Sequence, residues 1–224
     1  MLDSRMRAML GPALDAAGRR LARAGVPPVA LTGAGWAAGV GACAATALRA
    51  WPVALALWLA SRLLDGLDGP TARGYGSPTE AGGFLDIVAD FSIYAGVILG
   101  LAIALPAARL ACVALLTAYY ISGTAFLALS SLAERRRQRL GDERSLRFVG
   151  GLAEGTETIA VYVLLFLIPR HAVVIVWGFT AAVGITAAQR IVLGMRVLRP
   201  PAPSAAIPAG RAPRRAGGIT EPGG

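Results

Sequence analysis

The chain has 224 residues, 55% of them hydrophobic, and its mean hydropathy is +0.59. Ordinary soluble domains are about 45–50% apolar even when glycine is counted, so this composition excludes a typical soluble protein. The net charge is +9 and all 22 basic residues are Arg, but they flank apolar segments and form no separate basic domain with interleaved aromatic residues, which argues against nucleic-acid binding.

The first 25 residues contain five Arg and no apolar core of the length that a cleavable signal sequence needs. In a helix over residues 12–24, Leu14 and Leu21 lie on one side and the arginines of the segment lie near the other. This pattern is typical of an amphipathic helix in the membrane interface, so we expect a cytoplasmic amphipathic arm over residues 1–25. A frayed arm is the alternative.

Six segments further along the chain are candidates for crossing a membrane, which takes about 20 mostly apolar residues in a helix. Four of them carry no charge and are long enough or nearly so: 26–48, 91–108, 110–133 and 172–189. Two more, 51–74 and 148–169, become spans if embedded charges are tolerated. We therefore expect an all-α membrane protein with six transmembrane helices after the N-terminal interfacial helix.

The six spans form one domain in this prediction, over residues 26–198. Residues 199–224 are rich in Pro, Gly and Ala and are expected to form a disordered cytoplasmic tail. Within the first span, Gly35-x3-Gly39 is a small-residue packing face that serves either the bundle itself or a dimer.

The arginines predict the orientation, because an excess of basic residues marks the cytoplasmic side. Five precede the first span, six lie in 135–147 and six lie from Arg190 onward. The loops on the opposite side carry only Arg49, Arg109 and Arg170. Both termini and the loops around 74–80 and 134–147 are therefore expected in the cytoplasm.

Four aspartates lie at the cytoplasmic ends of the second and third spans. Asp65 and Asp68 are three residues apart, and Asp86 and Asp90 are four apart, so each pair shares one face of its helix. An acidic residue at the centre of a spanning helix costs about 2.5–3.5 kcal/mol on insertion scales, so such residues indicate function. A hairpin of the two helices can direct both pairs to one point.

Four converging carboxylates need a counter-charge, and no His or Cys accompanies them. Oxygen ligands suit Mg²⁺ or Mn²⁺, and four acids can hold two such ions about 3.5–4 Å apart. Gly69 and Gly82 lie one turn from the acids and allow close approach of a phosphate, a nucleotide or another helix. Arg73 supplies a guanidinium suited to phosphate oxygens. For Arg62, an ion pair with Asp65 is favoured over a contact with phosphate.

The pattern Asp65-x2-Asp68-Gly69-x2-Ala72-Arg73-x8-Gly82-x3-Asp86-x3-Asp90 resembles the signature of the CDP-alcohol phosphatidyltransferases at all eight specified positions. The resemblance implies an intramembrane enzyme, commonly a homodimer, that joins two alcohols through a phosphate and displaces CMP. It also implies site residues by position. Asp65, Asp68 and Asp86 would be metal ligands, Asp90 would be both a metal ligand and the general base, and Gly69, Ala72, Arg73 and Gly82 would line the CDP moiety.

Two further groups are candidates for binding the acceptor alcohol. Glu154 and Glu157 lie at the cytoplasmic start of the fifth span, where they either stabilise the helix N-terminus or border the acceptor pocket. Arg144, Arg147 and Arg190 lie at cytoplasmic span ends and suit a phosphorylated acceptor. Topology alone also explains these arginines, and we favour that explanation.

The expected function is transfer of a phosphatidyl group from CDP-diacylglycerol to a small alcohol, phosphorylated or not, in a bacterial-type inner membrane. The close alternative is transfer of a CDP-alcohol headgroup onto diacylglycerol. Other classes of protein also place acids in a membrane: intramembrane prenyltransferases, whose two Asp-rich motifs lie far apart, and divalent-cation transporters, whose acids should extend along a pore. The acceptor alcohol does not follow from the sequence.

Overall fold

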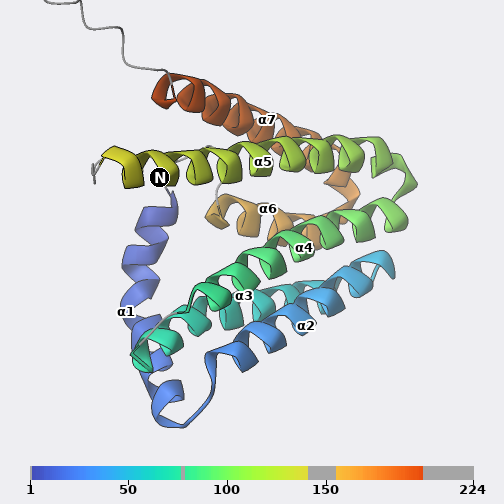
Figure 1. The fold of residues 1–224 in the computed structure, drawn as a ribbon. Helices are drawn as coiled ribbons and strands as arrows, with labels where there is room; N and C mark the ends of the chain where they lie inside the picture. The colour runs from blue at the N-terminus through green and yellow to red at the C-terminus, as the bar shows by residue number, and fades with distance from the viewer. Residues whose placement is uncertain (1, 77–78, 141–154, 199–224) are drawn as a thin grey trace, which may run out of the picture.

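The structure, a computed structural model, describes residues 2–76, 79–140 and 155–198. Every regular element in these residues is helical, which confirms the all-α prediction (Figure 1). The long helices are α1 (Leu2–Arg23), α2 (Pro28–Ala47), α3 (Trp51–Gly74), α4 (Glu80–Ala104), α5 (Arg109–Leu140), α6 (Gly155–Leu167) and α7 (Ala172–Val197). Short 3-10 turns, η1 (Pro106–Ala108) and η2 (Pro169–His171), precede α5 and α7.

Each of the six predicted spans contains a helix. Four helical segments are long and apolar enough to cross a membrane: Pro28–Ala47, Glu80–Ala104, Pro106–Leu132 and Pro169–Val197. Charged side chains interrupt the apolar sequence of α3 near its C-terminal end, and α6 has only 13 residues within the described part of the chain. The count of six spans therefore stays a prediction. Residues 141–154 and the tail, 199–224, lie outside the described residues.

Helix α2 packs against both helices that carry the aspartates. It packs along both α3 and α4, whereas the backbones of α3 and α4 lie further apart and these two helices meet through long side chains such as Arg62 and Tyr94. Gly35 permits this on one side, where a Cβ atom would lie 3.3 Å from Leu64 Cβ. Gly39 permits it on the other, where a Cβ atom would lie 2.7 Å from Ile93 Cδ1. The small-residue face of α2 is thus used for packing within the bundle.

An aromatic cluster ties the helices together beside the acidic ends of α3 and α4. Trp58 is fully buried, and its ring centroid lies 4.8 Å from that of Tyr162 and 5.8 Å from that of Tyr94. The Tyr162 hydroxyl donates to the Tyr94 carbonyl at 2.8 Å and lies 3.1 Å from the Tyr119 hydroxyl. Buried phenol groups need such partners, and these bonds connect α4, α5 and α6.

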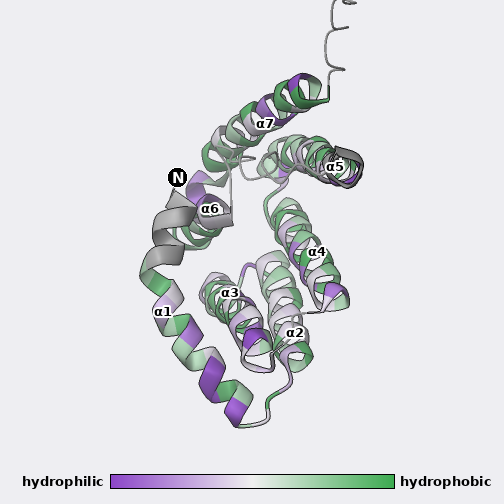
Figure 2. Ribbon diagram, turned by 60° about the vertical axis from the view of Figure 1, so that its left-hand side comes forward, coloured by the Kyte–Doolittle hydropathy of each residue, from purple (hydrophilic) through white to green (hydrophobic). Residues whose placement is uncertain are grey.

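Helix α1 packs against the C-terminal half of α3 instead of fraying. Gly18 makes the contact possible, because a Cβ atom there would lie 2.5 Å from Pro70 Cβ. Gly74 has the same function on α3, where a Cβ atom would lie 2.7 Å from Ala22 Cβ. Figure 2 shows hydrophilic and hydrophobic residues intermixed along α1, in contrast to the mainly apolar α4 and α5. Its position in a membrane interface stays a prediction.

Candidate active site

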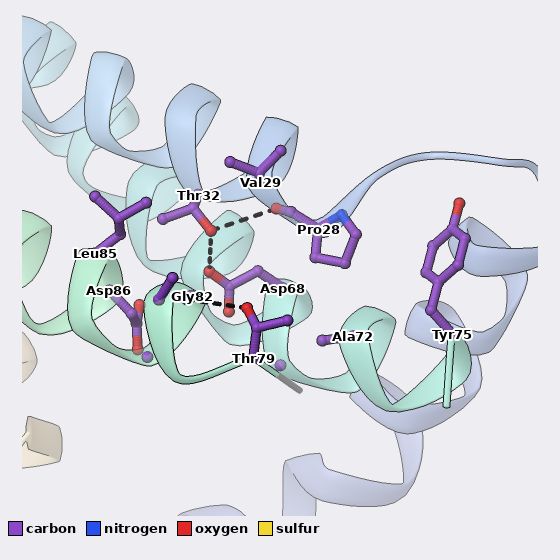
Figure 3. A pocket seen from close by; sticks show the side chains of 13 residues that line it. Pro28, Val29, Thr32, Asp68, Ala72, Tyr75, Thr79, Gly82, Leu85 and Asp86 are labelled. Carbon is purple, nitrogen blue, oxygen red and sulfur yellow. Dashed lines mark hydrogen bonds between the residues drawn. The ribbon is translucent and has the colours of Figure 1, made fainter. Parts of the chain in front are cut away.

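A cavity of 460 Å³ lies between α3 and α4, with α2 closing one side (Figure 3). Five of the eight signature residues line it: Asp68, Gly69, Ala72, Gly82 and Asp86. Helix α2 contributes Pro28, Val29 and Thr32. Helix α4 begins beside this cavity. Thr79 caps its N-terminus, because the Thr79 side chain accepts a hydrogen bond from the Gly82 N–H at 3.1 Å.

The side chain of Asp68 is held in place by a hydrogen bond from α2. The Thr32 hydroxyl donates to Asp68 Oδ2 at 2.7 Å, and the pair faces the cavity in Figure 3. A hydroxyl bond to one carboxylate oxygen restricts the rotamer of Asp68 and leaves the other oxygen for a ligand. Sequence reasoning missed Thr32, because a threonine within an apolar span carries no signal of this role.

Asp86 and Asp65 approach each other from α4 and α3. Their carboxyl groups are close enough to repel each other when both are ionised. Within the described part of the chain, Asp86 Oδ1 is buried without a hydrogen-bond partner. Two neighbouring carboxylates with a buried and unsatisfied oxygen are costly unless a cation or a proton joins them.

Asp90 has a different neighbour, the guanidinium of Arg62. Arg62 Nη1 donates to Asp90 Oδ1 at 2.5 Å and lies 3.7 Å from Asp65 Oδ2, which confirms the predicted pairing with Asp65. The Tyr94 hydroxyl donates to Asp90 Oδ2 at 3.4 Å. A second cavity of only 10 Å³, about the room that one water-sized sphere needs, lies among Arg62, Asp65, Asp90 and Thr32.

Arg73 forms its ion pair away from the main cavity. Its Nη2 donates to Asp15 Oδ1 of α1 at 2.8 Å, and both side chains are about half exposed. A separate cavity of 420 Å³ is lined by Asp15, Arg19, Arg23 and Arg73. Arg73 nevertheless lies beside the lining of the main cavity, because its Nη1 lies 3.6 Å from the position of a Cβ atom on Gly69.

A family model of the CDP-alcohol phosphatidyltransferases matches residues 26–188. The chain belongs to the CDP-alcohol phosphatidyltransferase family. The match covers the helices from α2 into α7 and therefore all four aspartates. The protein is accordingly an integral membrane enzyme, a transferase of substituted phosphate groups in phospholipid biosynthesis.

Known relatives agree with this family assignment. The inner membrane protein YnjF of Escherichia coli (strain K12) is 40% identical over 202 residues, which cover 89% of this chain and 98% of that protein. Two crystal structures of Mycobacterium tuberculosis phosphatidylinositol phosphate synthase (PgsA1) have the same fold. The complex with manganese and citrate has a TM-score of 0.69 at 22% identity and covers 81% of this chain and 88% of the other. The structure with CDP-DAG bound has a TM-score of 0.66 at 21% identity, with coverages of 81% and 92%.

The signature aspartates of this phosphatidyltransferase have the donor atoms that a divalent ion prefers, but their side chains are not gathered closely around one point. The donors are all carboxylate oxygens, and the unsatisfied Asp86 Oδ1 is an open ligand position. As the side chains stand, however, no three acidic, His or Cys groups in the described part of the chain gather closely enough to hold a metal ion. One contact contributes to the spread, because the guanidinium of Arg62 lies between the carboxylates of Asp65 and Asp90.

The predicted acceptor residues are only partly described. Glu157 lies in the first turn of α6, and its Oε2 is buried without a hydrogen-bond partner among the described residues. Arg190 on α7 donates to Ser122 Oγ at 2.8 Å and lies over the Phe126 ring, 5.1 Å from its centroid. Glu154, Arg144 and Arg147 lie outside the described residues. None of the acceptor candidates lines the main cavity within the described part of the chain.

Proposed function

We propose that this phosphatidyltransferase moves a phosphatidyl group from CDP-diacylglycerol to a small alcohol and releases CMP. The observation that carries the proposal is the cavity between α3 and α4, which gathers five signature residues around one space of 460 Å³. The family assignment supplies the reaction class. The PgsA1 structure with CDP-DAG bound, which has the same fold, supports this choice of donor.

The lining of the cavity suits the nucleoside diphosphate moiety of the donor. Gly69 and Gly82 carry no side chain, so the backbone of both helices is open to close contact. Ala72 adds only a methyl group, and Arg73 lies near enough to turn its guanidinium toward a phosphate. The acyl chains of the bound donor would extend laterally from the cavity into the membrane, along exposed apolar side chains of α4 such as Phe84 and Ile87.

In the reaction, the acceptor hydroxyl oxygen bonds to the phosphorus that carries diacylglycerol, and the bond from that phosphorus to the CMP oxygen breaks. Asp90 takes the proton of the attacking hydroxyl. Asp65, Asp68 and Asp86 would hold Mg²⁺ or Mn²⁺, in all about two ions. Such ions supply electrostatic stabilisation of the diphosphate and of the departing CMP. Thr32 keeps Asp68 oriented for this task.

The proposal also includes the cellular setting. We place the protein in a bacterial inner membrane, where YnjF is named as a resident protein, with six spans and with both termini and the active site on the cytoplasmic side. A homodimer is part of the same proposal. Glu154, Glu157, Arg144, Arg147 and Arg190 are the candidates for contacts with the acceptor, a small alcohol with or without a phosphate.

The test is CMP release by the purified protein in detergent or in vesicles. CDP-diacylglycerol, Mn²⁺ or Mg²⁺ and a panel of alcohols and phosphorylated alcohols should give CMP and a new phospholipid. A parallel reaction with CDP-alcohols and diacylglycerol tests the headgroup-transfer alternative. Flux of divalent ions into vesicles without CMP release would instead indicate a transporter and overturn the proposal.

A further inference from the structure

Arg62 is an unusual neighbour for the acidic centre, because it lies outside the eight signature positions. It is the cation of every ion pair that the described residues make with the four signature aspartates. Its side chain is only 8% exposed, although a free guanidinium strongly prefers water. Such burial requires a dedicated environment.

The structure provides that environment through two adjacent aromatic rings, whose centroids lie 5.8 Å apart. The carbon Cζ lies 5.1 Å from the centroid of the Trp58 ring and 5.2 Å from that of the Tyr94 ring. Both distances are within the range of cation–π attraction, which is strongest for desolvated cations. Arg62 thus packs against one ring of α3 and one ring of α4, and Trp58 is itself fully buried.

The edge of the guanidinium is directed at the carboxylates. Nη1 bonds Asp90 Oδ1 and lies near Asp65 Oδ2, while Nη2 donates to Ser61 Oγ at 3.1 Å. Nη1 also lies 3.2 Å from the Tyr94 hydroxyl, which in turn bonds Asp90 Oδ2. Arg62 therefore takes one oxygen of Asp90 that a divalent ion would otherwise use.

We propose that Arg62 is a resident counter-cation of this centre: it positions Asp90 and competes with the divalent ion for Asp90 and Asp65. This inference rests on the proposed function, because it presupposes a metal bound by the signature aspartates. The small cavity of 10 Å³ beside Arg62 has room for one ion or water, so a guanidinium and an ion at this point are close enough to repel each other.

Consequently, neutralising Arg62 should tighten divalent-ion binding, whereas a residue with a purely structural role would leave it unchanged or weaken it. Mn²⁺ binding to the full chain in detergent, without nucleotide, is measured from the electron paramagnetic resonance signal of free Mn²⁺. The dissociation constant of Arg62→Met should fall about tenfold or more. Arg62→Lys, which retains the charge and the apolar stem, should bind with nearly wild-type affinity.

The control is Arg109→Met, which removes an equal charge at the opposite end of α4, where Arg109 donates to the Ala102 carbonyl. It should leave the Mn²⁺ affinity unchanged. If thermal unfolding shows that Arg62→Met does not fold, Arg62→Gln is the neutral variant, since its amide retains a donor for Asp90. An affinity that is equal to wild type or weaker in the folded neutral variant would overturn the inference.

The same measurements separate this inference from the proposed function. Wild-type protein that releases CMP, combined with an unaltered Mn²⁺ affinity in the neutral variants, removes only the competing role of Arg62. Wild-type protein that neither binds Mn²⁺ nor releases CMP removes the metal centre and the proposed reaction together.

Discussion

The two oxygens of the Asp90 carboxylate have different partners, and this difference bears on the proposed role of Asp90 as a base. Oδ1 accepts a short bond from Arg62, whereas Oδ2 accepts only a long and therefore weak hydrogen bond, at 3.4 Å, from the Tyr94 hydroxyl. Oδ2 is therefore the oxygen that can accept the proton of an acceptor hydroxyl.

Asp90→Asn should lower kcat by about 10²–10⁴-fold, because the amide cannot take the proton. The measurement is CMP release at saturating CDP-diacylglycerol, with thermal unfolding as the check on folding. Glu80→Gln, an exposed substitution in the first turn of the same helix, is the control and should retain wild-type turnover. Equal turnover in both variants would remove Asp90 as the base.

Thr32 gives a second test at the level of one side chain. Thr32→Val keeps the shape and removes the hydroxyl bond to Asp68, and bonds to charged groups contribute about 1.5–3 kcal/mol. We expect the Mn²⁺ concentration for half-maximal CMP release to rise about tenfold or more. Thr180→Val removes a hydroxyl bond to the Val176 carbonyl on α7 and should not shift this concentration.

Sequence reasoning found the aspartates but not the contacts that hold them. The spacing of a signature reveals which residues share a helix face, so Asp65 and Asp68 could be paired in advance. The contacts of Asp90 with Arg62, and of Asp68 with Thr32, join residues that are 28 and 36 positions apart. Such pairings depend on helix packing, which local periodicity does not encode.

At the level of helices, most predicted segments agree with the observed helices, because each apolar run in the sequence ends near residues that end a helix. Helix α3 occupies residues 51–74 as predicted, whereas α4 spans Glu80–Ala104 and so begins before the expected uncharged segment 91–108. The arrangement of these helices differs from the expected hairpin. Helix α2 packs between them, and glycines that the sequence left open to a dimer make this possible.

The docking of α1 on α3 leads to a prediction with a matched control. Gly18→Ala would bring a Cβ atom 2.5 Å from Pro70 Cβ and should displace α1, whereas a Cβ atom on Gly11 meets nothing within 4 Å. Alanine favours a helix over glycine by about 1 kcal/mol, so Gly11→Ala should leave the melting temperature equal or higher. Gly18→Ala should lower it.

Displacement of α1 should also affect the donor site, because Asp15 on α1 holds Arg73. We expect Gly18→Ala to raise KM for CDP-diacylglycerol, while Gly11→Ala leaves it unchanged. Thermal unfolding in detergent and initial rates of CMP release measure the two effects. A Gly18→Ala variant with wild-type stability and KM would show that the contact between α1 and α3 is dispensable.

For the molecule as a whole, the distribution of arginines predicts which end of the bundle faces the cytoplasm. The test uses a background in which Cys43 and Cys112, the two cysteines of the chain, are replaced by Ala. In intact cells, a membrane-impermeant maleimide should label the Arg170→Cys variant but not the Ala24→Cys variant. Both sites are exposed, so their accessibility reflects the side of the membrane. The opposite labelling pattern would reverse the orientation.

The buried indole at the centre of the aromatic cluster has an optical consequence. All four tryptophans lie in the described residues, and Trp58 is the fully buried one, whereas Trp36 and Trp177 are 49% and 44% exposed. Trp58 also lies directly against the guanidinium that contacts the acidic centre. Any ion or nucleotide that moves this guanidinium changes the electric field at the indole. Replacing the other tryptophans by Phe would therefore leave an intrinsic fluorophore that reports ligand occupancy without a label.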